Sequence, residues 1–246
     1  MAVNYNINNL VYRWPNLHQR FFTIPGLCYL CNSTLKNKDI LLCCSCKNSL
    51  PTNDAACVGC AMPVMTGDLC ADCIRNRKSA TTNTICLYRY AYPVNKLIQD
   101  MKFNSRLILA RFFGQSLATH IIKMKTELPE CIIPVPLHSS RLGQRGYNQS
   151  LELARHLSCF LRLPLNRDSL RRVRNTQAQS ELPASKRKRN IRGAFTVNGQ
   201  SLAGADHVAI IDDVITTGST ANEVARQLKK AGVKRIDVWA CARAVI

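Results

Sequence analysis

The chain has 246 residues, of which 46% are hydrophobic and 20% are charged, and this composition is typical of a globular protein with one large domain or two small ones. No apolar run approaches the roughly 18 residues that a membrane-spanning helix needs, and residues 1–22 lack the apolar core and cleavage site of a signal peptide. We therefore expect a cytoplasmic protein with no membrane-inserted segment. The formal net charge of +19 favours polyanionic partners, namely nucleic acids or phosphorylated metabolites.

The amino-terminal third is dominated by cysteines. Residues 1–27 predict a helical or irregular lead-in interrupted by Pro15 and Pro25. Residues 28–73 hold four Cys-x2-Cys pairs and no long apolar periodicity. Two residues between cysteines let one turn present both sulfurs to one ion, and a segment with so little apolar content needs metal to fold. We expect a double zinc ribbon with two structural zinc ions.

The pairing of the eight cysteines is open at this point. The favoured arrangement is sequential, with one ion held by Cys28, Cys31, Cys43 and Cys46 and the other by Cys57, Cys60, Cys70 and Cys73. A cross-braced arrangement fits the same spacing. In both arrangements protein fills all four ligand positions, so neither ion would activate water.

The rest of the chain predicts an α/β domain. Residues 74–82 are polar and predict a linker, and residues 83–246 alternate between strand and helix patterns. In chain order, we expect a strand at 84–90, helices at 92–103 and 107–125, a strand at 131–137, a helix at 149–163, strands at 193–197 and 207–212, a helix at 219–232 and a strand at 235–242. Residues 171–192 show no periodicity and predict a mobile loop. This alternation indicates a mostly parallel sheet flanked by helices.

The stretch VAIIDDVITTGST, residues 208–220, carries the most specific chemistry. It predicts a buried strand ending on Asp212 and Asp213, then a loop, then a helix that begins near Ser219. Ligands of parallel sheets bind at the carboxyl ends of the strands, and a helix amino terminus binds anions. We expect a phosphate to be bound by the amides and hydroxyls of Thr216, Thr217, Gly218, Ser219 and Thr220. The two acids would accept hydrogen bonds from vicinal hydroxyls, so the predicted ligand is a phosphorylated sugar, with a metal ion held through it.

The same stretch resembles the phosphoribosyl-pyrophosphate motif of type I phosphoribosyltransferases. Further segments extend the match, namely the cysteine pairs, LIQDMKF (97–103), IIPVPL…RGYNQS (132–150), and Thr176, Gln179, Arg189 and Asn190 followed by GAF (193–195). Together they resemble the ComF/GntX family over residues 25–243. Members are described as phosphoribosyltransferase-like proteins of natural competence and of the use of external DNA.

The resemblance implies a type I phosphoribosyltransferase-like domain, preceded by the zinc ribbons, that binds phosphoribosyl pyrophosphate with magnesium. Asp212 and Asp213, the candidate catalytic pair, would hold the ribose hydroxyls, and residues 216–220 the 5′-phosphate. Arg145 and Lys102 would meet the pyrophosphate. Arg145 has support of its own, because the adjacent glycines allow close approach of an anion, whereas a dipole-stabilising helix-end lysine explains Lys102 equally well. Residues 171–192 would form a flap over the site.

The positive charge is concentrated in one part of the chain. Residues 141–192 hold 13 Lys and Arg against three acids. The simplest interpretation is a solvated surface, but the clustering favours phosphate contacts with single-stranded DNA, with the candidates Lys186, Arg187, Lys188 and Arg189. The same four residues could instead close over pyrophosphate. The resemblance further implies protein partners in the DNA-import machinery.

Three functions are compatible with these observations. The first is a DNA-uptake factor that binds phosphoribosyl pyrophosphate and single-stranded DNA, and the second is an active phosphoribosyltransferase that salvages nucleobases. The third, a zinc-ribbon interaction protein with a degenerate sheet domain, is opposed by the intact 216–220 loop. Enzyme activity stays open because no acceptor site is visible: Tyr88, Tyr90, Tyr92 and Phe103 are more typical of packing residues. His138 and His207 show no partner and are weak candidates for general bases.

Overall fold

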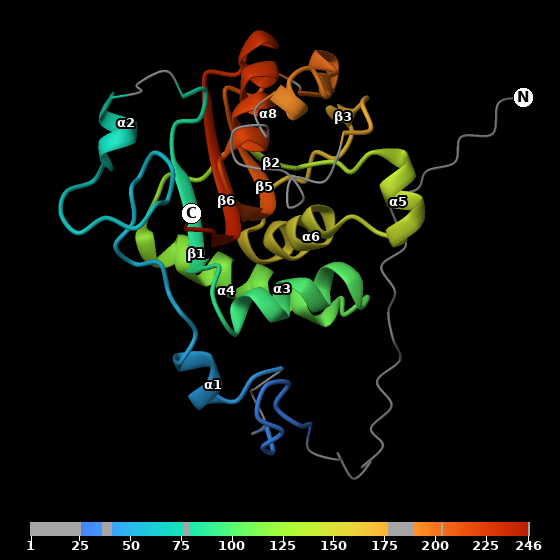
Figure 1. Ribbon diagram of the computed structural model, residues 1–246. Helices are drawn as coiled ribbons and strands as arrows, with labels where there is room; N and C mark the ends of the chain where they lie inside the picture. The colour runs from blue at the N-terminus through green and yellow to red at the C-terminus, as the bar shows by residue number, and fades with distance from the viewer. Residues whose placement is uncertain (1–25, 36–40, 76–78, 177–188, 203, 246) are drawn as a thin grey trace, which may run out of the picture.

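The computed structural model describes residues 26–35, 41–75, 79–176, 189–202 and 204–245 (Figure 1). Its centre is a four-stranded parallel sheet with the order β1-β6-β5-β2. The strands are β1 (Thr84–Arg89), β2 (Cys131–Pro134), β5 (His207–Ile215) and β6 (Arg235–Arg243). These confirm four predicted strands. Their side chains are mostly buried on both faces, as expected for parallel strands covered by helices on each side.

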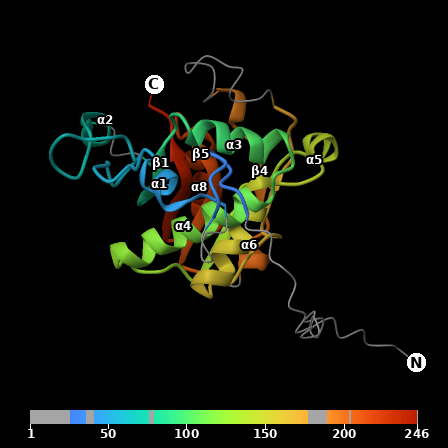
Figure 2. The ribbon, with the colours of Figure 1, turned by 90° about the horizontal axis from the view of Figure 1, so that it is seen from below.

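Helices cover both faces of this sheet, and each face has its own apolar core. On one face lie α3 (Val94–Phe103), α4 (Ile108–Met124) and α6 (Gln149–Leu161), which stand in front of the strands in Figure 2. On the other face lies α8 (Ser219–Lys230). Alternate residues of β5 divide between the two cores: Ala209 and Ile211 face the three helices, while Val208 and Ile210 face α8. The predicted α/β class is therefore confirmed.

Residues 170–197 differ from the sequence prediction. The strand predicted at 193–197 forms as β4 (Phe195–Val197), but it lies outside the main sheet and pairs antiparallel with β3 (Leu170–Arg172). The loop predicted over 171–192 is therefore wrong at its start. A three-residue strand is too short to show a periodicity, and this explains the error. Residues 177–188, which include most of the predicted flap, lie outside the described residues.

Among the described residues, further short helices occur after β2 and among the cysteines. The first is α5 (Ser139–Arg145), and the cysteine region contains α1 (Cys44–Asn48) and α2 (Ala71–Arg75), with the 3-10 turn η2 at Gly199–Leu202 further on. None was predicted, because each has at most two turns. Across the described ranges, no helix combines the length and apolar character that crossing a bilayer requires.

The cysteine region packs against the main domain. Cys28 and Leu42 belong to the same core as α3 and α4, and the Tyr29 hydroxyl donates to Asp100 of α3 over 2.9 Å. Further along, Thr52 pairs antiparallel with Tyr88 of β1. The region is therefore held to the sheet domain at several places. The predicted domain limits at residues 27, 73 and 82 remain predictions.

Candidate functional site

The loop between β5 and α8 leaves backbone donors free. It comprises residues 216–218, and its last residue, Gly218, has φ +73 and provides no side-chain cap for α8. Among the described residues, the N–H groups of Thr216 and Thr217 donate no hydrogen bond. The hydroxyls of Thr217 and Ser219 are 2.7 Å apart. Free amides, hydroxyls and the positive end of a helix together favour an anion at this loop.

The two acids lie just before this loop, in different settings. Asp213 forms an ion pair with Lys102 of α3, with 2.8 Å between Lys102 Nζ and Asp213 Oδ1. Asp212 accepts hydrogen bonds from the Ser150 hydroxyl over 3.1 Å and from the Asp213 N–H over 2.9 Å. Burial, followed by the neighbouring Asp213 carboxylate, raises the pKa of Asp212 to about 7. Near neutral pH the pair is therefore poised to give up a proton when hydroxyls or a cation arrive.

A single cavity of about 440 Å³ joins these groups. It is lined by every residue that was predicted to contact the ligand: Lys102, Arg145, Asp212, Asp213, Thr216, Thr217, Gly218, Ser219 and Thr220. These residues come from α3, α5, β5, the loop and α8. The structure thus brings together acids, phosphate-binding amides and cations that are far apart in the sequence.

Several basic side chains also line the cavity. Arg145 is the last residue of α5, and its guanidinium carbon lies 5.0 Å from the ring centroid of Phe103. Sequence reasoning missed Arg141 and Arg172, which line the same cavity. Arg141 donates to the Thr176 carbonyl and Arg172 to the Thr176 hydroxyl, each over 2.5 Å. The Arg172 Nε is buried and has no partner among the described residues. Four cations against two acids leave the cavity suited to a polyanion.

Neither histidine considered as a general base lies in this cavity. His138 caps α5, where its Nδ1 accepts from the Ser140 N–H over 3.3 Å. His207 begins β5, at the end of the sheet opposite to Asp212, and its Nε2 lies 2.9 Å from Asp237 Oδ2. Both histidines therefore have structural partners, which agrees with their being weak candidates for general bases.

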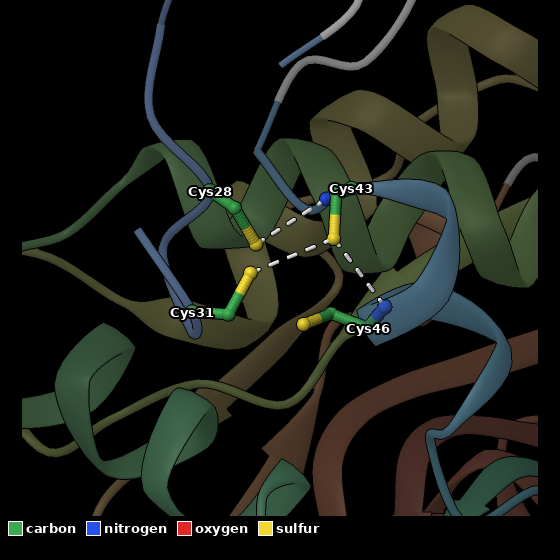
Figure 3. Close-up of side chains that lie close together, drawn as sticks. All are labelled: Cys28, Cys31, Cys43 and Cys46. Atoms are coloured by element: carbon green, nitrogen blue, oxygen red, sulfur yellow. Dashed lines mark hydrogen bonds between the residues drawn. The ribbon is translucent and has the colours of Figure 1, made fainter. Parts of the chain in front are cut away.

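The eight cysteines form two clusters, and the clusters are sequential. The sulfurs of Cys28, Cys31, Cys43 and Cys46 lie within 4.8 Å of one another (Figure 3), and so do those of Cys57, Cys60, Cys70 and Cys73. The Sγ atoms of Cys31 and Cys43 are 3.7 Å apart, and those of Cys60 and Cys70 are 3.6 Å apart. A tetrahedral zinc site with Zn–S bonds of about 2.3 Å requires sulfurs about 3.8 Å apart, so both clusters fit zinc.

Backbone N–H groups stabilise one thiolate in each cluster, at Cys28 and at Cys57. The Cys43 N–H lies 3.3 Å from the Cys28 sulfur. In the second cluster, burial alone would raise the pKa of Cys57, but backbone donors from Cys70, Cys60 and Gly59 outweigh it and lower this pKa to about 7. Metal-binding cysteines must be deprotonated, so these donors assist zinc binding.

The predicted nucleic-acid contacts are only partly visible. Arg189 is described and exposed, whereas Lys186, Arg187 and Lys188 lie outside the described residues. Binding of nucleic acid by these four residues therefore stays a prediction.

Two solved structures are distantly similar to the chain. A glutamine phosphoribosylpyrophosphate amidotransferase from B. subtilis is 17% identical, with a TM-score of 0.37, and the match covers 53% of this chain and 25% of that one. A purine phosphoribosyltransferase from Pyrococcus horikoshii is 20% identical, with a TM-score of 0.30 and coverage of 56% and 86%. No family model matches the sequence.

Curated relatives are closer and cover most of the chain. DNA utilization protein YhgH of Escherichia coli K12 is 32% identical over 90% of this chain and 98% of its own length. Competence protein F of Haemophilus influenzae is 37% identical over 71% and 78%, and competence protein ComFC of Streptococcus pneumoniae is 24% identical over 88% and 99%. With its parallel sheet, its two four-cysteine clusters and its similarity to these relatives, the chain belongs to the ComF family of competence and DNA utilization proteins.

Proposed function

We propose that this protein acts in the cytoplasm in the uptake and use of external DNA, and that its cavity binds phosphoribosyl pyrophosphate with magnesium. The main support for this ligand is the lining of one cavity, which combines the acid pair, the phosphate loop (residues 216–218) and several basic side chains. The names of the relatives support the process. Proteins of the DNA-import machinery are the expected partners.

Each part of the ligand has a matching group in the cavity. The free amides after Ile215 suit the 5′-phosphate, and the carboxylates of Asp212 and Asp213 suit the ribose hydroxyls. Arg145, with Arg141 and Arg172, suits the pyrophosphate. A bound magnesium ion would neutralise part of the pyrophosphate charge. Lys102 pairs with Asp213, and ribose hydroxyls bound at Asp213 would release this lysine towards the pyrophosphate.

Calorimetric titration tests the ligand. Phosphoribosyl pyrophosphate with magnesium should bind the wild type, and Asp213→Asn should weaken binding by about tenfold or more, because a charged acceptor of hydrogen bonds is lost. Asp206→Asn is the matched control, since this acid lies before β5 at the far end of the sheet and pairs with Lys234. A wild type that binds no more tightly than Asp213→Asn would reject the proposal.

We further propose that the basic segment binds single-stranded DNA through Lys186, Arg187, Lys188 and Arg189. The support is the concentration of positive charge over residues 141–192. Replacing all four residues by glutamine should lower the dependence of log affinity on log salt concentration by about 2.8, which is 0.7 for each lost phosphate contact. An unchanged salt slope in a fluorescence-anisotropy titration would place the DNA elsewhere.

One observation favours the second candidate, an active phosphoribosyltransferase in nucleobase salvage. Phe103 is 69% exposed, and it lines the cavity together with Tyr90, so an aromatic surface is available for a base. The test is base-dependent release of pyrophosphate in the presence of magnesium. No release with any natural base would leave binding without transfer.

A further inference from the structure

Arg243, the last residue of β6, is buried beneath the phosphate loop. It is 6% exposed, and within the described residues it forms no ion pair with a carboxylate. Its donors go instead to backbone carbonyls. Nε donates to Cys60 over 2.8 Å, and Nη1 donates to Ile215 over 3.1 Å, to Ala244 over 2.6 Å and to Thr216.

These bonds connect two functional parts of the molecule. Cys60 belongs to the second cysteine cluster, whereas Ile215 directly precedes the phosphate loop (residues 216–218) and Thr216 is its first residue. A cavity of about 720 Å³, lined by Cys60, Arg243 and Thr217 among others, separates the cluster from the start of α8. Among the described residues, no hydrogen bond runs directly between residues 57–73 and residues 215–220, and Arg243 bonds to both. The guanidinium is therefore the polar link across this gap.

The link determines the direction in which the loop amides point. In a trans peptide the C=O and the following N–H point in opposite directions. Since Arg243 holds the carbonyls of Ile215 and Thr216, the N–H groups of Thr216 and Thr217 are directed away from it and stay free to donate. The buried positive charge under the loop also attracts an anion. Both effects favour phosphate binding.

The turn that carries the Cys60 carbonyl is held by β1 on one side and belongs to the cysteine cluster on the other. On its β1 side, Thr84 donates its N–H to Val58 over 2.8 Å and its hydroxyl to Gly59 over 2.9 Å. Cys57 and Cys60 supply two of the four sulfurs from this same turn. A zinc ion bound by the cluster would fix the turn, and its loss would free the acceptor of the Arg243 Nε.

We propose that Arg243 is a positioning residue that couples the second cysteine cluster to the phosphate loop, so that zinc at Cys57, Cys60, Cys70 and Cys73 sets the affinity of the loop for a terminal phosphate. The coupling rests on the proposed phosphoribosyl-pyrophosphate site. Through this coupling the cluster would influence ligand binding, although none of its cysteines would touch the ligand.

The first test is a double-mutant cycle in the full chain, with bound zinc and affinity for phosphoribosyl pyrophosphate with magnesium as readouts. Arg243→Gln should keep two zinc ions and weaken the affinity about tenfold to a hundredfold, the effect of losing a hydrogen bond from a charged group. Cys70→Ser should lose one zinc ion and weaken the affinity to a similar extent. The double variant should bind phosphoribosyl pyrophosphate no more weakly than the single variant with the lower affinity, because both changes break the same link.

The matched control is Arg235→Gln, an arginine at the other end of the same strand that pairs with Glu127 and Asp237. It should keep both the zinc content and the affinity of the wild type. Independent, additive losses from Arg243→Gln and Cys70→Ser would overturn the coupling. Wild-type affinity in a Cys70→Ser protein that has lost its zinc would do the same.

Amide hydrogen exchange separates the coupling from the ligand proposal, because it needs no ligand. The Asn222 N–H donates to Gly218 over 2.9 Å, and the Ala244 N–H donates to Ile215 over 2.9 Å. In Cys70→Ser both amides should exchange about tenfold faster than in the wild type, while the amides of α6 should not change. Faster exchange without any binding by the wild type would reject the ligand and keep the coupling. Unchanged exchange at both amides would reject the coupling.

Discussion

Lys102 and Asp213 form an ion pair at 2.8 Å inside the candidate ligand cavity, and their side chains are only 22% and 12% exposed. Although burial disfavours the charged lysine, the Asp213 carboxylate outweighs it and raises the pKa of Lys102. The pair links α3 to the end of β5 and balances one of two adjacent acids. The ion pair therefore joins two of the elements that line the cavity.

Removing this lysine should destabilise the fold. In Lys102→Met, Asp213 stays largely buried without its cation, and we expect the free energy of unfolding to fall by about 2 kcal/mol, less than for a fully buried pair because of the residual exposure. Urea unfolding measures the loss. Lys234→Met removes an exposed pair with Asp206 and should cost less than about 0.5 kcal/mol. Equal losses in the two variants would contradict the role given to Lys102.

The raised pKa of Asp212 predicts a pH dependence of stability. The native carboxyl has a pKa of about 7, against 3.8 for the ordinary group, so the native state binds the proton more tightly than the unfolded chain. Stability should therefore fall as the pH rises from about 4 through about 7, by roughly 4 kcal/mol in all. Asp212→Asn has no such proton to lose. Its unfolding free energy should exceed that of the wild type at pH values of about 8, and the difference should shrink towards pH values of about 5.

The proton bound by Asp212 should also be released when the ligand binds. Hydroxyls and magnesium favour the ionised acid, so phosphoribosyl pyrophosphate should displace a proton from the wild type near pH values of about 6.5. Calorimetry in two buffers with different ionisation enthalpies measures the released protons. Proton release of the same size by Asp212→Asn would assign it to another group.

Much of the sheet domain could be predicted from the sequence because its elements are long or strongly patterned. The buried runs around Ile210 and Val238 and the amphipathic repeat of α8 carry clear periodicities. The short elements α5 and β3 do not, and both were missed. Glycines beside Arg145 indicated a loop, whereas Gly143 lies within α5 and only Gly146 ends it.

The site was predictable where one motif holds it and not where packing assembles it. Residues 212–220 are contiguous, so their pattern predicts one locality. Ser150, Arg172 and Arg243 reach the same place from α6, β3 and β6. Nothing in the basic segment distinguishes Arg172 from its neighbours, and nothing local pairs Arg243 with Cys60. The grouping of the cysteines likewise needed the folded chain, because the spacing alone allowed two arrangements.

The two clusters predict a stoichiometry that can be dissected. The wild type should bind two zinc ions, and Cys31→Ser should lose the one held by the first cluster while keeping the other. Cys86→Ser, a buried strand cysteine outside both clusters, should keep two. Atomic absorption on the purified proteins gives the counts. Loss of both ions from Cys31→Ser, in a protein that keeps its helical circular dichroism, would indicate shared ligands and contradict two separate sites.

Gly218 offers a test of the loop that involves no charge. Its φ of +73 is unfavourable for side chains, yet a Cβ added there would meet nothing within 4 Å, so Gly218→Ala introduces backbone strain without a clash. We expect about 1 kcal/mol of destabilisation from this strain. Relief of the strain by rotation of the loop would turn the free amides of Thr216 and Thr217, so the affinity for phosphoribosyl pyrophosphate should fall as well. Gly199→Ala is the control, because that glycine has equal space and no positive φ. Full affinity in a destabilised Gly218→Ala would show that the phosphate does not depend on these amides.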